Sequence, residues 1–209
     1  LDWGCHISGS DIKTSNVTER LQRKGAIIHI GQKAENITEK IDIVVRSSAI
    51  RENNEELIQA RKLGIEILHR SQMLAMLMEH KRAICVAGAH GKTTTSSMIA
   101  LMMELAGKDP TIVVGGEIAQ ISSNAKSGRG DLLVAEADES DGSFLNLLPW
   151  MAVLTNVEED HLDHYKDLDE IRQAFIAFIR KTGDHGVVVL NYDCEETRKM
   201  ANLIPGKMI

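Results

Sequence analysis

The sequence predicts an α/β protein whose sheets are mostly parallel and are covered by helices. Two observations lead to this prediction. Short apolar segments of strand length alternate with amphipathic segments of helix length along almost all of the 209 residues. One junction between them, at 87–92, is a glycine turn that opens directly into a helix. A strict alternation of strands and helices is typical of parallel strand pairing, because each helix carries the chain back to the start of the next strand.

The first part of the chain contains the shorter elements. Apolar runs predict strands at 6–11, 26–30, 41–45 and 65–68. The spacing of apolar side chains predicts helices at 17–24, 53–63 and 71–79. Asn53 or Asn54 is a candidate N-cap of the second helix and Ser71 of the third, because such side chains accept hydrogen bonds from unpaired N–H groups at a helix start.

The second part of the chain contains longer elements. Strands are predicted at 83–87, 111–114, 131–137, 151–157 and 186–190. A helix follows the glycine turn and ends near Gly107, since glycine suits a helix C-terminus and Pro110 prevents continuation. A second helix is predicted at 169–180, and the polar segment 122–130 is predicted to be a loop. We place a domain boundary just before residue 80, which divides the chain into 1–79 and 80–209.

The glycine turn is the most informative motif. Its residues are Gly88-Ala89-His90-Gly91-Lys92-Thr93-Thr94-Thr95. A strand, a glycine turn, Lys-Thr and a helix in this order are typical of a phosphate-binding loop, in which N–H groups and the helix N-terminus hold the anion. Lys92 would contact the β- and γ-phosphates, and the Thr93 hydroxyl would bind Mg²⁺. The full Walker spacing requires glycine where Val86 stands, so a turn that merely starts a helix remains the alternative.

An acidic segment follows the strand predicted at 131–137. It reads Glu136-Ala-Asp-Glu-Ser-Asp141, and its four carboxylates repel one another unless a cation lies among them. Ligands of open α/β sheets bind at the carboxyl ends of strands. Glu136 is therefore a candidate Mg²⁺ ligand across from Thr93, and a solvated acidic turn is the alternative.

A third polar segment follows the strand that contains Ala152. It runs from Thr155 to Tyr165 and includes His161, Asp163 and His164. A histidine after such a strand is a candidate metal ligand or base, and an ordinary surface or capping residue is the alternative. The His-x-Asp-His arrangement also occurs in zinc and di-metal hydrolases, although no second histidine cluster completes a coordination shell.

The composition excludes several classes of protein. Hydrophobic residues make up 43% of the chain, which suits a folded globular protein, and the net charge of −6 argues against nucleic-acid binding. The cysteines Cys5, Cys85 and Cys194 lack metal-like spacing and fit a reducing cytoplasm, with Cys85 in the core. No apolar run approaches the roughly 18 residues of a membrane helix, and no signal peptide is recognisable. We expect a cytoplasmic bacterial protein without nucleic-acid or membrane partners, and the sequence sets no oligomeric state.

Taken together, the three motifs resemble those of the Mur ligases of peptidoglycan synthesis. The segments Ser8-Gly-Ser-Asp11, Ser47-Ser-Ala-Ile50 and Met73-Leu74 fit the same family in the expected order. The resemblance covers nearly the whole chain. It implies a truncated Rossmann-like domain over 1–79 that binds a UDP-sugar, followed by part of a P-loop ATPase-type domain over 80–209.

The resemblance also implies cofactors, substrates and residue roles. ATP and Mg²⁺ would convert the lactyl carboxylate of UDP-N-acetylmuramate into an acyl phosphate, which the amine of L-alanine attacks. The ATP site would consist of Gly88, Ala89, His90, Gly91, Lys92, Thr93 and Thr94. Catalysis would involve Lys92, Glu136 and His161. Thr93 and Glu136 would hold one Mg²⁺ and His161 a second one, while Asp11, Ser47 and Ser48 would contact the sugar nucleotide.

Departures from the family pattern define further expectations. Family members often have threonine where Ala89 stands, but the backbone N–H is retained. The chain is also shorter than the three-domain family, so we expect an incomplete and inactive portion that lacks the C-terminal domain. The family's ligase for recycled muropeptides, which typically has tyrosine in place of Ser140, ranks second. A non-catalytic ATP-binding module and a metal-dependent hydrolase are two further candidate functions.

Overall fold

The computed structural model describes residues 1–121, 123–201, 203 and 207–208. The chain forms two compact units, Leu1–Met73 and Leu74–Ile209, which are described separately. The division falls within helix α3 (Arg70–Met78). The boundary expected before residue 80 lies just after the end of this helix and stays a prediction.

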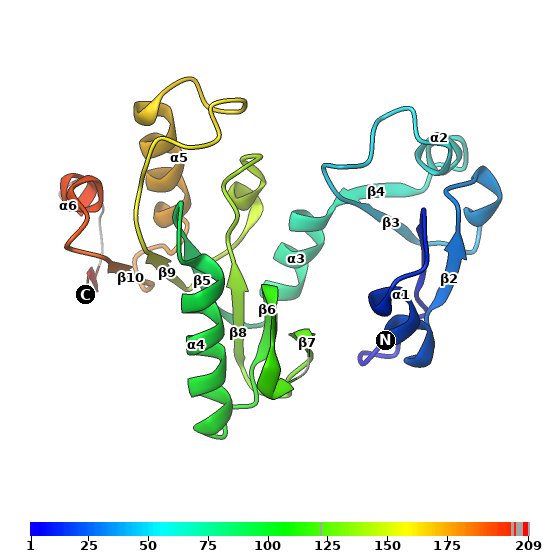
Figure 1. Cartoon of the computed structure of the whole chain (residues 1–209), viewed down its shortest axis with the longest axis horizontal. Coiled ribbons are helices and arrows are strands. Elements are labelled where there is room, and N and C mark those ends of the chain that lie inside the picture. Colours follow the sequence, from blue (N-terminus) through cyan, green and yellow to red (C-terminus); the bar gives the residue numbers. More distant parts are fainter. Residues whose placement is uncertain (122, 202, 204–206, 209) are drawn as a thin grey trace. The chain divides into compact units, whose positions relative to one another are not determined.

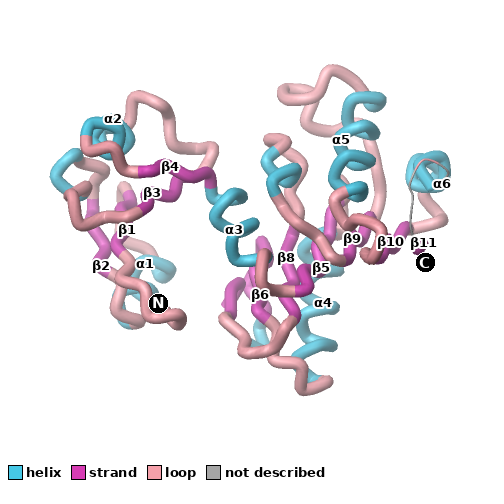
Figure 2. Tube along the Cα trace, turned by 180° about the vertical axis from the view of Figure 1, so that it is seen from behind, coloured by secondary structure: helices cyan, strands magenta, loops and turns pink. Residues whose placement is uncertain are grey.

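The first unit contains two separate pairs of parallel strands. β1 (Ser8–Asp11) pairs with β2 (Ile27–Ile30), and β3 (Ile43–Arg46) pairs with β4 (Glu66–His69). Helix α1 (Asn16–Arg23) connects β1 to β2, and α2 (Glu55–Lys62) lies between β3 and β4 in the chain. Figure 2 shows the two strand pairs and their helices. These elements confirm the strand–helix alternation predicted for this part of the sequence.

The helix starts of the first unit show which capping predictions hold. The Asn54 side chain accepts hydrogen bonds from the N–H groups of Glu56 and Leu57, so Asn54 is the N-cap of α2. The prediction for Ser71 was wrong, because α3 already begins at Arg70. The Ser71 hydroxyl instead lies 2.7 Å from Nδ1 of His69.

The second unit is built on a seven-stranded sheet in the order β11-β10-β9-β5-β8-β6-β7. All neighbouring strands are parallel except β6 and β7, which are antiparallel. The strands are β5 (Arg82–Ala87), β6 (Thr111–Ile118), β7 (Ser123–Lys126), β8 (Leu132–Glu136), β9 (Met151–Leu154), β10 (Val187–Leu190) and β11 (Lys207–Met208). The helices are α4 (Lys92–Leu105), α5 (Leu168–Arg180) and α6 (Glu195–Ala201) (Figure 1). The predicted mostly parallel α/β fold is confirmed.

Both faces of this sheet are buried, as parallel sheets require. Successive residues of β5 belong to different cores: Cys85 packs in the cluster that contains Phe175 of α5, whereas Ile84 packs in the cluster that contains Ala100 of α4. Cys85 is a core residue as predicted, and burial raises the pKa of its thiol to about 12. Because α4 and α5 cover opposite faces, the strand order reverses at β5. Ligands of such sheets bind at the carboxyl ends of the strands beside this reversal.

Several local predictions were wrong. Segment 122–130, expected to be a loop, contains β7, although residue 122 lies outside the described residues. The β7 residues Ser-Asn-Ala-Lys lack an apolar alternation, so pairing with β6 and not local pattern makes them a strand. Helix α6 was not anticipated. Phe144 packs against Phe175 and Phe178, and the guanidinium carbon of Arg82 lies 3.8 Å from the centre of the Trp150 ring. None of the helices in the described part of the chain is both long and apolar enough to span a bilayer.

Candidate active site

The predicted phosphate loop connects β5 to α4 through two glycines in the left-handed region. Gly88 has a φ of +129°, and Gly91, the N-cap of α4, has a φ of +80°. A Cβ atom on Gly88 would clash with the Thr155 hydroxyl and lie 2.8 Å from the main-chain oxygen of Asn156. Only glycine therefore allows the loop to pass this closely against the end of β9.

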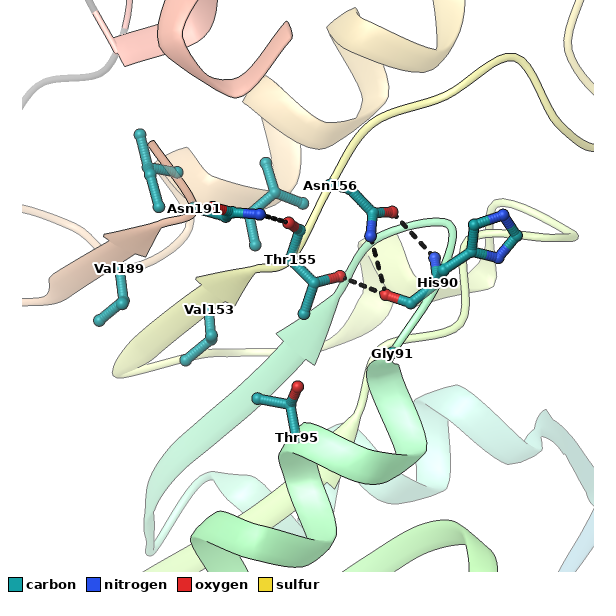
Figure 3. A pocket seen from close by; sticks show the side chains of 10 residues that line it. His90, Gly91, Thr95, Val153, Thr155, Asn156, Val189 and Asn191 are labelled. Atoms are coloured by element: carbon teal, nitrogen blue, oxygen red, sulfur yellow. Dashed lines mark hydrogen bonds between the residues drawn. The ribbon is translucent and has the colours of Figure 1, made fainter. Parts of the chain in front are cut away.

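Side chains that follow β9 hold the loop in place. The Thr155 hydroxyl donates a hydrogen bond to the His90 main-chain oxygen. Asn156 binds the main chain of the same residue twice: its Oδ1 accepts from the His90 N–H at 2.9 Å, and its Nδ2 donates to the His90 oxygen at 3.1 Å (Figure 3). Asn191, after β10, donates to the main-chain oxygen of Thr155 at 2.8 Å. The carboxyl ends of three neighbouring strands, β5, β9 and β10, are thus linked to one another.

These residues surround a cavity of about 450 Å³ at the carboxyl ends of β9 and β10. Figure 3 shows polar groups of Thr155, Asn156 and Asn191 on one side and Val153 and Val189 on the other. Thr95, from the first turn of α4, also lines the cavity. A cavity with apolar walls and a few polar groups beside a phosphate loop has the composition of a small-molecule site.

Lys92, the first residue of α4, points back over the loop. Its Nζ donates to the main-chain oxygens of Gly88 at 2.7 Å and Ala89 at 3.3 Å, and to Oε1 of Glu139 at 2.9 Å. The Glu139 side chain is only 3% exposed. Burial raises the pKa of Glu139 above its ordinary value, and the hydrogen bond from Lys92 partly opposes this rise.

His161 approaches the same buried carboxylate from the segment after β9. Its Nε2 lies 3.8 Å from Oε1 of Glu139 and 3.7 Å from Oδ2 of Asp160. The His161 backbone has a φ of +54°, which is uncommon outside glycine, and such strained residues concentrate at functional sites. Glu139 therefore lies between Lys92 and His161, two residues that the sequence predicted for one site.

Ser96 and two glycines of β6 lie beside Thr93 and Glu136. The buried Ser96 hydroxyl lies 3.1 Å from the Thr93 main-chain oxygen and 3.3 Å from Oε1 of Glu136. A Cβ atom on Gly115 would lie 2.7 Å from Oε2 of Glu136, and one on Gly116 would lie 2.9 Å from Cγ2 of Thr93. The absence of side chains on these two β6 residues leaves room for both predicted ligands.

The donor chemistry of Thr93 and Glu136 fits Mg²⁺. Mg²⁺ prefers hard oxygen ligands and is commonly held by one or two protein groups together with phosphate oxygens and water. A hydroxyl and a half-buried carboxylate beside a phosphate loop provide such groups. Among the residues that the structure describes, no group of three or more His, Cys, Asp and Glu side chains is arranged to hold a metal. His161, Asp163 and His164 thus do not form the protein-only set of a zinc hydrolase.

The remaining predicted residues fall into two places. Thr94 is exposed in the first turn of α4, and the His90 ring is exposed and lies 3.5 Å from Oε2 of Glu158. The sugar-nucleotide candidates belong to the first unit. Asp11 ends β1 and accepts a hydrogen bond from the Lys13 N–H. Ser47 follows β3, and the Ser48 hydroxyl lies 3.0 Å from Nε2 of His69.

Sequence reasoning gave no roles to several residues that shape this site. Glu139 was one of four carboxylates, and nothing in the sequence singles out the one that is buried against Lys92. The position of Thr155 and Asn156 beside the loop could have been inferred, because both residues directly follow β9, which pairs with the strand before the loop. Ser96 lies one helical turn after Thr93 and therefore on the same side of α4. Its contact with Glu136 could be inferred only once this position around the helix was known.

Comparison with known proteins places these features in a family. The Mur ligase family catalytic domain matches residues 1–82, and the Mur ligase middle domain matches residues 86–208. The chain is 49% identical to the UDP-N-acetylmuramate–L-alanine ligase of Desulfatibacillum aliphaticivorans, over 98% of this chain and 44% of that protein. It is also 49% identical to the ligase of the same name from Carboxydothermus hydrogenoformans, over 94% of this chain and 42% of that one. The chain thus spans less than half the length of these relatives.

Solved structures give the same result. The UDP-N-acetylmuramate–alanine ligase of Thermotoga maritima matches with a TM-score of 0.82 and 30% identity, over 93% of this chain and 45% of that chain. The UDP-N-acetylmuramate:L-alanyl-gamma-D-glutamyl-meso-diaminopimelate ligase of Neisseria meningitides matches with a TM-score of 0.88 and 28% identity, over 99% of this chain and 71% of that chain. With two family domains matched in sequence, the chain belongs to the Mur ligase family.

Proposed function

We propose that this chain is part of a cytoplasmic, ATP- and Mg²⁺-dependent ligase that joins L-alanine to UDP-N-acetylmuramate in the synthesis of peptidoglycan precursors. The names of the relatives at 49% identity support the substrates. The observation that carries the proposal is the convergence of Lys92, Glu139 and His161 beside the phosphate loop. A pure nucleotide sensor has no need for a histidine at this place.

The proposed reaction follows from the chemistry of a carboxylate. A carboxylate is a poor acyl donor, and its conversion to an acyl phosphate creates a leaving group that an amine can displace. Two anions must approach each other for this transfer, so positive charge must offset their repulsion. Lys92 would contact the transferring phosphate from the start of α4. Thr93, Glu136 and His161 would hold Mg²⁺, which supplies further positive charge at the phosphates.

The two parts of the chain would share the work. We propose that residues 1–79 bind the UDP-sugar, with contacts from Asp11, Ser47 and Ser48. Residues 80–209 would bind ATP on the loop 88–94. The amino-acid site would come from the part of the full-length ligase that lies beyond these two domains. The 209 residues alone would then bind ATP without forming product.

The experiment uses two proteins, which are this 209-residue chain and the full-length enzyme that contains it. Isothermal titration should show ATP binding to the chain, and Lys92→Ala should weaken this binding. In the complete enzyme, Lys92→Ala should abolish L-alanine-dependent phosphate release in the presence of UDP-N-acetylmuramate. Normal turnover of that variant would contradict the assignment of the loop.

A second candidate is the ligase that attaches an intact muropeptide to the same sugar nucleotide. The Neisseria meningitides structure, whose TM-score is 0.88, carries such a name. Ser140 argues against this candidate, because muropeptide ligases typically have tyrosine at that position. Competition between L-alanine and the tripeptide L-alanyl-γ-D-glutamyl-meso-diaminopimelate in the complete enzyme separates the two. Preference for the tripeptide would favour the second candidate.

A further inference from the structure

The three hydrogen-bond donors of the Lys92 ammonium are all engaged. Two of them go to main-chain oxygens of the loop itself, at Gly88 and Ala89. The third goes to Oε1 of Glu139, which comes from the segment after β8. A lysine ammonium has three donors. A phosphate can therefore receive a hydrogen bond from Lys92 only in exchange for one of these acceptors.

Glu139 is held so that its carboxylate stays beside Lys92. Its main-chain oxygen accepts hydrogen bonds from the Tyr165 hydroxyl at 2.6 Å and from the Gly142 N–H at 3.0 Å. The Tyr165 ring is itself buried. Oε2 of Glu139 is buried and has no hydrogen-bond partner among the residues that the structure describes. A buried oxygen without a partner is costly, so the position of this carboxylate beside Lys92 requires an explanation other than its hydrogen bonds.

The charges of this pair compete with a nucleotide. The ion pair joins two largely buried groups, since the Lys92 side chain is 15% exposed and that of Glu139 is 3% exposed. Its carboxylate is a negative charge fixed at the point where the negative phosphates would bind. Such a charge opposes phosphate binding and, at the same time, keeps the ammonium at one position. The neutral main-chain oxygens of the loop attract the ammonium less strongly than this carboxylate does.

We propose that Glu139 is a positioning residue, which holds Lys92 in the loop before nucleotide binds and releases it to the phosphates afterwards. This inference rests on the proposed function, because it requires that Lys92 contact a nucleotide. The carboxylate then remains within reach of His161, 3.8 Å away, so the same group contacts both Lys92 and His161.

The first test is the affinity of the 209-residue chain for ATP without Mg²⁺, measured by isothermal titration. Glu139→Gln keeps the shape of the side chain and removes its charge. A hydrogen bond to a charged group is roughly 1 kcal/mol stronger than a neutral one, so this variant should bind ATP about three- to tenfold more tightly than the original chain. Glu158→Gln is the matched control, because it removes an exposed charge near the loop, and its affinity should stay within about twofold.

The result distinguishes this inference from the proposed function. If the original chain binds ATP neither with nor without Mg²⁺, the proposed function fails. If it binds ATP and Glu139→Gln binds equally or more weakly, the proposed function stands and the positioning role of Glu139 is overturned. In the complete enzyme, Glu139→Gln should lower kcat at least about tenfold without raising KM for ATP, since outer ligands of catalytic groups have effects of this size.

A second measurement, the melting temperature, tests the pairing of Lys92 and Glu139 without any nucleotide. Lys92→Met leaves the buried Glu139 carboxylate without its counter-charge, so it should lower the melting temperature of the nucleotide-free chain. Adding Glu139→Gln to Lys92→Met should restore part of that loss. Additive losses in the double variant would show that the two side chains do not act as a pair, and this would overturn the inference.

Discussion

The hydroxyl of Thr155 donates a hydrogen bond of 2.7 Å to the main-chain oxygen of His90, and it lies 3.2 Å from the main-chain oxygen of Ala87. The end of β9 therefore fixes both the entry and the middle of the phosphate loop. Thr155→Val keeps the shape of the side chain and removes these contacts. We expect the free energy of unfolding to fall by about 1–2 kcal/mol, measured by urea denaturation. Thr155→Ser, which keeps the hydroxyl, should retain most of the stability, and equal losses in both variants would argue against the hydrogen bonds as the cause.

Gly88 and Gly107 provide a matched pair for the close approach of the loop to β9. Both have positive φ angles, but a Cβ atom on Gly107 meets nothing within 4 Å, whereas one on Gly88 meets Thr155 and Asn156. Gly107→Ala should cost about 1–2 kcal/mol of stability from the backbone conformation alone. Gly88→Ala should cost at least about 3 kcal/mol, because overpacking adds to the backbone term. Thermal denaturation of both variants tests this difference, and similar melting temperatures would contradict the expected clash with the residues after β9.

Gly115 leaves space for the carboxylate of Glu136. A Cβ atom there would lie 2.7 Å from Oε2, so Gly115→Ala should displace the carboxylate without touching the loop. We expect the Mg²⁺-dependent gain in ATP affinity to fall about tenfold or more, with Mg²⁺-free binding unchanged. Titrations with and without Mg²⁺ measure this gain. Gly107→Ala serves as the control, and an unchanged gain in Gly115→Ala would count against Glu136 as a metal ligand.

The ion pair between Asp109, which follows α4, and Lys126 of β7 is expected to weaken in acid. Lys126 Nζ lies 2.8 Å from Oδ1 of Asp109 and also contacts Glu104. The hydrogen bond from Lys126 lowers the pKa of Asp109, so the folded-state pKa lies below the unfolded one. The resulting stabilisation is present above the unfolded pKa and is lost as the pH falls through the folded pKa.

The variant Asp109→Asn tests this link, because asparagine tolerates the φ of +42° at this position. Its melting temperature should be below that of the original chain at about pH 7, and the difference should vanish at about pH 2. Asp184→Asn, at an exposed carboxylate, should show little difference at either pH. A difference for Asp109→Asn that persists in acid would indicate a cause other than charge.

The three phenylalanines form one aromatic cluster beneath the acidic segment. The ring of Phe144 lies 5.6 Å from that of Phe175 and 5.1 Å from that of Phe178, and all three are buried. Phe144→Ala should lower the free energy of unfolding by about 3–5 kcal/mol, measured by urea denaturation. Phe144→Leu should lose less than half of that, since it keeps most of the buried volume. An equal loss in both variants would mean that the rings themselves, not their volume, provide the stability.

The order of strands and helices was predictable because most of these elements have a recognisable apolar pattern in their own residues. The apolar run at Ala83–Ala87 and the helical spacing after Lys92 identify β5, the loop and α4 without any tertiary information. Strand β7 has no such pattern, since its four residues are strand only through their partner β6. The capping residue was predictable for α2, where Asn53 or Asn54 was expected and Asn54 is the N-cap, and not for α3.

The candidate site was predictable to the level of motifs and not of contacts. The rule that ligands gather at the carboxyl ends of parallel strands led to Glu136 and Thr93 as a predicted pair of Mg²⁺ ligands, and the roles of these residues stay a prediction. The contact between Lys92 and His161 goes through Glu139, and burial is what distinguishes this carboxylate from its three neighbours in the acidic segment. Burial depends on the packing of distant segments, here that of Tyr165, which the sequence pattern does not encode locally.

Strand β7 has a consequence for association of the molecule with its own copies. It forms one edge of the seven-stranded sheet, and its register with β6 is interrupted between Val113 and Ile118. A strand of another molecule can pair with a straight, apolar edge strand. An irregular edge strand that carries a lysine disfavours such pairing. The short β7, which pairs irregularly with β6 and ends in Lys126, thus resists the addition of another strand at this edge of the sheet.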